Sequence, residues 1–180
     1  MLKKFRHNKF QKALTLRKAD EKRLIINKGF EESESFLLLF DCTSEEKFNE
    51  FSRIQSSLQI KNKIVHAIGF HGLSALPAWC KQSIHTAYIG KNDINSSGIP
   101  SDDLVEDSLN TPFDVLIDLT YCMHPVFHWI ITLSNAYLKI GAGDNKIQQK
   151  LDIYIDIPNG KTQEELFSLA TQYQNMFQKK

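Results

Sequence analysis

The sequence has little of what marks fibrous, disordered or membrane-spanning proteins. Its 180 residues hold only 8 glycines and 5 prolines, which excludes a collagen-like chain, and 42% hydrophobic residues exclude wholesale disorder. No run of about 18 apolar residues occurs, so we expect no membrane span. The basic N-terminus is not followed by an apolar stretch, so we expect no signal peptide. A soluble, cytoplasmic chain with one sizeable core is therefore predicted.

Cysteine is scarce as well. Cys42, Cys80 and Cys122 are the three cysteines, and none forms a CxxC spacing. An odd number without that spacing favours free thiols in a reducing compartment over a disulfide framework. Cys42 lies where a helix is predicted to begin, a position that can activate a thiol. A small buried cysteine is the commoner situation, and we favour it here.

The glycine-rich loops of nucleotide-binding proteins are missing. The sequence contains neither GxGxxG nor GxxxxGK[ST], and it lacks the GxSxG elbow of serine hydrolases. The loop 41–44 has no glycine, so a pyrophosphate could not approach its backbone as in dinucleotide-binding folds. We therefore predict no catalytic residues and no cofactor.

What the chain does have is a strongly uneven charge. The net charge is +1, but residues 1–28 hold ten Lys and Arg against two acids, a balance of +8, which leaves −7 for the rest. We divide the chain into a basic, helical N-terminal arm (1–30) and an acidic body (31–180). Such an arm suggests contact with a polyanion. The candidate nucleic-acid-binding residues are Lys3, Lys4, Arg6, Lys9, Lys12, Arg17, Lys18 and Arg23.

Three interpretations of the arm remain open. Phe5 and Phe10 lie among the cations and could stack on bases, as in single-stranded nucleic-acid binding. The same rings could dip into an anionic membrane surface. Alternatively, the arm is a solvated helix that packs on the acidic body, with Leu14 and Leu16 seeking cover.

The body alternates strand-like and helix-like segments. A continuous apolar run (36–40) is typical of a strand that is covered on both faces. Capping boxes at Thr43-x-x-Glu46 and Thr162-x-x-Glu165 predict helix starts, as does Pro125. Residues 73–81 form a loop or a short helix. The other predicted elements are strands at 64–69, 86–89, 113–119, 137–140 and 151–157, and a short helix at 102–109.

This alternation predicts an α/β fold, a single Rossmann-like doubly wound sheet. We expect five to six mostly parallel strands with helices on both faces. The last strand alternates apolar and polar residues, which is typical of an edge strand, and it could run antiparallel.

Polar residues at the ends of the strands are the candidate ligand-binding site, because open α/β sheets bind ligands at their carboxyl edge. Besides His71-Gly72, they are Asp41, Thr43, Asp118 and Thr120. If the first and fourth strands are neighbours, Asp41 and Asp118 could face each other, hold Mg²⁺ or share a proton. The simpler alternative is that each aspartate caps a helix or binds loop amides.

His124 and His128 are spaced to share one helix face, where a metal could bind with Cys122 or Asp118 as a third ligand. No HExxH pattern is present. We favour the interpretation that both side chains are hydrogen-bonded histidines of the core, and we predict no metal site.

Several motifs resemble an uncharacterised Bacteroidota protein family, a domain of unknown function. They are the basic arm, the run Phe36 to Glu46, Ile68-Gly69-Phe70, Lys91-Asn92-Asp93-Ile94-Asn95, Phe113 to Leu119 and Leu133 to Gly141. The resemblance implies a Rossmann-like fold and brings no activity with it. A fainter likeness to the N-terminal half of heptosyltransferases, in 113–119 and 139–141, implies a fold that binds donor and acceptor between two domains.

The sequence therefore favours a non-catalytic binding or assembly module. Its α/β body would dock on a protein or ribonucleoprotein, and its arm would contact a polyanion, most readily RNA. The alternative is a small enzyme or glycosyltransferase-like domain that binds a phosphorylated or sugar-nucleotide ligand at the carboxyl ends of the strands.

Overall fold

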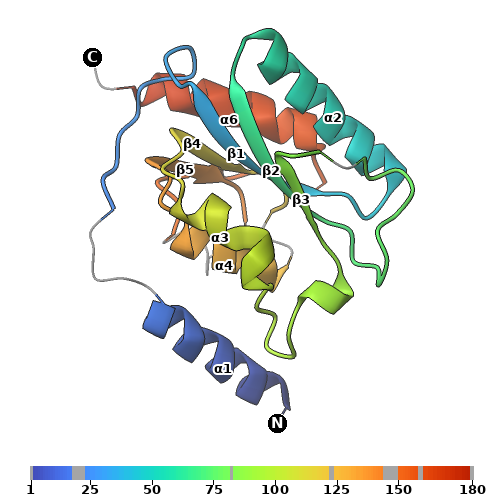
Figure 1. The fold of residues 1–180 in the computed structure, drawn as a ribbon. Coiled ribbons are helices and arrows are strands. Elements are labelled where there is room, and N and C mark those ends of the chain that lie inside the picture. Colours follow the sequence, from blue (N-terminus) through green and yellow to red (C-terminus); the bar gives the residue numbers. More distant parts are fainter. Residues whose placement is uncertain are drawn as a thin grey trace.

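A computed structural model describes residues 2–17, 23–81, 83–121, 124–143, 150–157 and 160–178, without the side chains of residues 2–5. Its centre is a six-stranded sheet with the order β3-β2-β1-β4-β5-β6 (Figure 1). The strands are β1 Ser35–Asp41, β2 Ile64–Phe70, β3 Thr86–Ile89, β4 Val115–Asp118, β5 Leu138–Gly141 and β6 Ile153–Tyr154. All neighbouring strands are parallel, including β6 at the edge. The α/β prediction is confirmed.

Helices cover both faces of the sheet, because β1 is apolar on both sides. Phe36, Leu38 and Phe40 pack under α2 (Glu45–Ile60) and α6 (Gln163–Met176). Leu37 and Leu39 point the other way, toward α3 (Asp102–Asn110) and α4 (Pro125–Leu133). Alternate residues of one strand therefore contribute to two separate cores. None of the described helices is long and apolar enough to cross a bilayer.

The helix starts follow the sequence closely, with one correction. Thr162 caps α6 as predicted, its hydroxyl accepting a hydrogen bond from the Glu165 N–H at 3.1 Å. Pro125 occupies the first turn of α4. The cap of α2 is Ser44 rather than the predicted Thr43, and the Ser44 hydroxyl accepts a hydrogen bond from the Lys47 N–H at 3.3 Å. Residues 73–81 form a loop, and a short 3-10 helix, η1 (Lys91–Asp93), was not predicted.

The arm contains a helix, α1 (Leu2–Arg17), which forms a further layer outside α3 and α4 (Figure 1). Phe10 and Leu14 are buried, at 4% and 5% exposure, against Trp129 of α4. The Phe10 ring meets Trp129 edge-on, with 5.7 Å between ring centroids. Leu16, expected to seek cover, is instead 78% exposed. The helix is thus docked through one narrow apolar face.

Candidate functional site

The strand order reverses between β1 and β4, which lie side by side with Leu39 opposite Asp118. In open α/β sheets this is where ligands bind, outside the carboxyl ends of the strands. A cleft of about 610 Å³ opens there, which we call the switch-point cleft. Its polar lining includes Asp41, Glu46, Lys47, Glu50, Thr120, Tyr121 and Lys161.

Asp41, at the end of β1, lines this cleft and is held in place from two sides. Its Oδ1 accepts a hydrogen bond from the Thr43 N–H at 2.8 Å, and its Oδ2 forms an ion pair with Lys47. The side chain of Asp41 is 12% exposed and that of Lys47 39% exposed. The carboxylate therefore binds a loop amide, as the simpler prediction proposed, and still borders the cleft.

Asp118 and Thr120 form a second closed turn at the end of β4. Asp118 is 1% exposed, and its Oδ1 accepts hydrogen bonds from the Thr120 N–H at 2.9 Å and from the Thr120 hydroxyl at 2.6 Å. Of the candidate residues, Asp41 and Thr120 line the switch-point cleft, whereas Thr43 and Asp118 do not. Asp118 thus positions Thr120 rather than facing Asp41 across the opening.

Gln163 joins the end of β1 to α2, and no sequence pattern identified it. Its Oε1 accepts from the Asp41 N–H at 2.9 Å. Its Nε2 donates to the backbone oxygens of Asp41 and Lys47, at 3.2 and 2.8 Å. Its own N–H donates to Glu50 at 2.9 Å. Gln163 is buried at the first position of α6, and its burial is a property that the sequence does not display.

Tyr121 was also missed, and its backbone is unusual. Its φ is 54°, in the left-handed region, which is costly for a bulky residue and is often found at functional sites. Burial raises the pKa of Tyr121, and the Lys161 N–H, which donates to its hydroxyl, opposes that shift. The loop after β4 is therefore held in a strained shape at the edge of the switch-point cleft.

The remaining candidate groups are structural within the described residues. Cys42 is fully buried, as favoured, and Cys80 is a second free and buried cysteine. Burial raises the pKa of both thiols, which argues against a reactive Cys42. Cys122 lies outside the described residues.

The histidines give the same result. His124 caps α4, its Nδ1 accepting from the Val126 N–H at 3.3 Å, and it stacks on Phe70. Burial lowers the pKa of His124. His128 contacts Phe10, with ring centroids 5.5 Å apart. His71, at the end of β2, is buried and its Nδ1 accepts from the Leu73 N–H. No group of three or more metal-ligating side chains occurs in the part of the chain that the structure describes.

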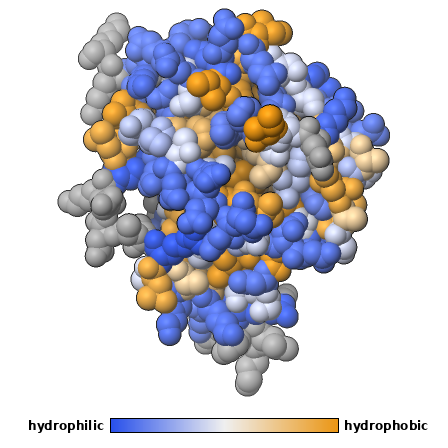
Figure 2. Space-filling view, viewed as in Figure 1, coloured by the Kyte–Doolittle hydropathy of each residue, from blue (hydrophilic) through white to orange (hydrophobic). Residues whose placement is uncertain are grey.

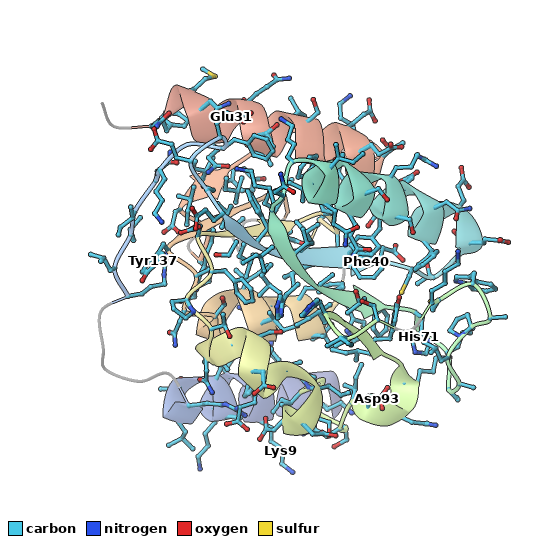
Figure 3. The ribbon with its side chains drawn as sticks, turned by 45° about the horizontal axis from the view of Figure 1, so that its top comes forward. Lys9, Glu31, Phe40, His71, Asp93 and Tyr137 are labelled. Atoms are coloured by element: carbon cyan, nitrogen blue, oxygen red, sulfur yellow. The ribbon has the colours of Figure 1, made fainter. Side chains whose placement is uncertain are left out.

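The cations of the arm fall into two sets. Arg6, Lys9 and Lys12 have exposed side chains on α1, and we call them the outer cations. Lys9 lies on the side of α1 that is turned away from the sheet (Figure 3). Hydrophilic residues cover most of the face in Figure 2, with only separate apolar patches between them. Lys18 and the side chains of Lys3 and Lys4 lie outside the described residues.

Arg17, Arg23 and Lys28 instead bind carboxylates of the body, and we call them the inner cations. Arg17 pairs with Asp102. Arg23 reaches Asp152 at 2.5 Å and also donates to two backbone oxygens. Lys28 donates to Asp114 at 2.7 Å, a contact that raises the pKa of Lys28. Arg17 and Arg23, two of the candidate nucleic-acid-binding residues, therefore each bind a carboxylate of the body, and their contact with nucleic acid stays a prediction.

Comparison with known proteins gives a family without an activity. A model described as a family of unknown function (DUF6913) matches residues 3–173. No curated protein matches the chain. The match includes α1 as well as the sheet, so arm and body occur together in one family pattern. The likeness to heptosyltransferases stays a prediction.

Proposed function

The chain belongs to this family of unknown function, and we propose that it is a non-catalytic binding module that contacts RNA through the outer cations. Its α/β body would dock on a protein or ribonucleoprotein partner. The observation that carries this proposal is the orientation of α1, which buries Phe10 and Leu14 and leaves Arg6, Lys9 and Lys12 exposed.

The docking of α1 favours a nucleic acid over a lipid surface. Phe10, one of the rings that would dip into a membrane, is buried against Trp129. Leu16 is the single large apolar side chain that is exposed among the side chains described on α1. Insertion into a headgroup layer needs a continuous apolar face, whereas phosphate contact needs only exposed cations.

The same geometry limits how RNA would be recognised. Because α1 lies against α4, it presents one side rather than entering a groove. The buried Phe10 cannot stack on a base. We therefore expect contact with the phosphate backbone, with little dependence on base sequence. The acidic body would repel RNA elsewhere and confine it to α1.

The test is a salt titration of RNA binding by the full chain. Fluorescence anisotropy with a labelled single-stranded RNA gives the slope of log K against log salt. Each lost phosphate contact reduces that slope by about 0.7. Replacing all three outer cations by alanine should therefore reduce it by about 2. The matched control replaces three exposed lysines of the body, Lys61, Lys81 and Lys91, and should leave most of the slope in place.

An unchanged slope in the outer-cation variant would overturn the proposal. So would an equal loss in the control variant, because it would show that net charge alone drives binding. A single-stranded DNA of the same length should bind about as well as the RNA if the backbone is what α1 contacts. Sedimentation with anionic liposomes but no RNA binding would support the membrane interpretation instead.

A further inference from the structure

RNA contact through the outer cations does not involve the switch-point cleft. We propose that this cleft binds a small hydroxyl-rich phosphate monoester, such as a sugar phosphate, with Lys47 and Lys161 at the phosphate and the Glu46 and Glu50 carboxylates at the hydroxyls. This inference concerns a different face of the fold and does not depend on RNA binding.

The size and position of the switch-point cleft suit such a ligand. Its volume of about 610 Å³ lies within the usual range of small-molecule sites. It opens where the strand order reverses, so the loops after β1 and β4 both border it.

The floor of the cleft is organised without a ligand. Gln163 fixes the end of β1 against α2 through its bonds to Asp41 and Lys47. Asp118 fixes Thr120 in the same way at the end of β4. A site whose polar groups are already held in place loses little freedom on binding.

The charges of the lining select the class of ligand. Lys47 is paired with Asp41 and Lys161 with Glu165, but both lysine side chains are 39% exposed, so a bound phosphate can reach both ammonium groups. They are outnumbered by the carboxylates of Asp41, Glu46 and Glu50. This balance disfavours a pyrophosphate or a triphosphate, as does the absence of glycine from the loop 41–44. Two lysines suffice for one phosphate, and carboxylates are good acceptors for sugar hydroxyls.

Tyr121 completes the site. Its strained backbone brings an aromatic residue to the edge of the cleft, beside Leu119. The partly exposed Tyr121 ring offers an apolar surface that the carbon face of a sugar ring can cover.

The experiment measures binding of hexose and pentose monophosphates to the full chain by calorimetry and thermal shift. The comparison ligands are the free sugars, inorganic phosphate and a nucleoside diphosphate. We expect at least one monophosphate to bind. Its free sugar should bind at least about tenfold more weakly, because the charge-assisted contacts of Lys47 and Lys161 with the phosphate are both lost. A nucleoside diphosphate that binds more tightly than every monophosphate would contradict the proposed ligand class.

Variants locate the binding. Lys161→Ala should weaken the monophosphate by about tenfold or more, and Glu46→Gln should weaken it while sparing inorganic phosphate. Lys91→Ala, an exposed lysine outside the cleft, is the matched control. Lys161 and Glu46 are both exposed, so these variants should still fold. Equal binding by Lys161→Ala and the parent chain, or no binding by any monophosphate, would overturn the proposal. The outer-cation variant should bind the monophosphate as tightly as the parent chain does, even if it no longer binds RNA.

Discussion

The outer and inner cations of the arm are the same kinds of residue in one stretch of chain, yet they differ in exposure and in their contacts with the body. Lys12 on α1 is exposed, whereas the side chain of Arg23 is 20% exposed and bound to Asp152. The difference arises because acidic residues of the body lie along the path of the second half of the arm. One run of positive charge therefore holds cations that fasten the arm to the body and cations that stay exposed on α1.

The largest effect is expected from a substitution that weakens the docking of α1 on α4. Phe10→Ala removes the ring that packs on Trp129, and we expect a loss of about 3 kcal/mol in the free energy of unfolding. Urea denaturation measures it, and trypsin should cut the variant faster after Lys12 and Arg17. Leu16→Ala, at a position that is 78% exposed, should change stability by less than about 0.5 kcal/mol. If Phe10→Ala were silent, α1 would not be fastened as described.

A second prediction concerns the pair of Lys28 and Asp114. Burial tends to raise the pKa of Asp114, but hydrogen bonds from Lys28 and from the N–H groups of Glu34 and Ser35 outweigh it and lower that pKa. Because the pKa of Asp114 is lower in the folded state than in the unfolded state, the ionised carboxylate stabilises the fold. This stabilisation is fully present above the pKa of the unfolded state and is lost as the pH falls through the pKa of the folded state. Asp114→Asn should thus cost about 2 kcal/mol at pH 7.

The pH dependence of that cost is the informative measurement. Denaturation curves at several pH values should show the parent and Asp114→Asn proteins converging below about pH 4, where the carboxylate is protonated in the unfolded chain. Asp103→Asn, on the exposed surface of α3, is the control. A difference that stayed constant down to pH 2 would mean that the charge of Asp114 contributes nothing.

The smallest expected effect distinguishes two cations on one helix. The side chains of Arg17 and Asp102 are 31% and 58% exposed, so their ion pair is largely solvated. Arg17→Ala should cost about 0.5 kcal/mol at low salt and almost nothing at about 1 M salt. Lys12→Ala should change neither value. Equal effects for the two variants would erase the distinction between inner and outer cations.

Local rules were enough to predict most of the fold. The apolar run of β1 required cover on both faces, and the Thr162 capping box placed the start of α6 correctly. The start of α2 was misplaced by one residue because Thr43 and Ser44 are neighbouring hydroxyl residues that can both cap a helix, and the sequence does not say which of them does.

The candidate site was only half predictable. Asp41 and Thr120 follow apolar strands, so the strand-end rule finds them. Gln163 lies 122 residues from Asp41 in the chain, and no local pattern links the two. Tyr121 is unusual only in its backbone angle, which a sequence does not display.

The amino-acid sequence by itself determined the α/β class, the parallel strands and the excess of positive charge at one end, because these depend on side-chain periodicity and composition. Only the tertiary structure decided that Arg17 and Arg23 pair with carboxylates of the body. Arg17 and Asp102 are 85 residues apart in the chain, and Arg23 and Asp152 are 129 apart. Charges attract according to their distance in space, and the folding of the sheet and α4 sets that distance.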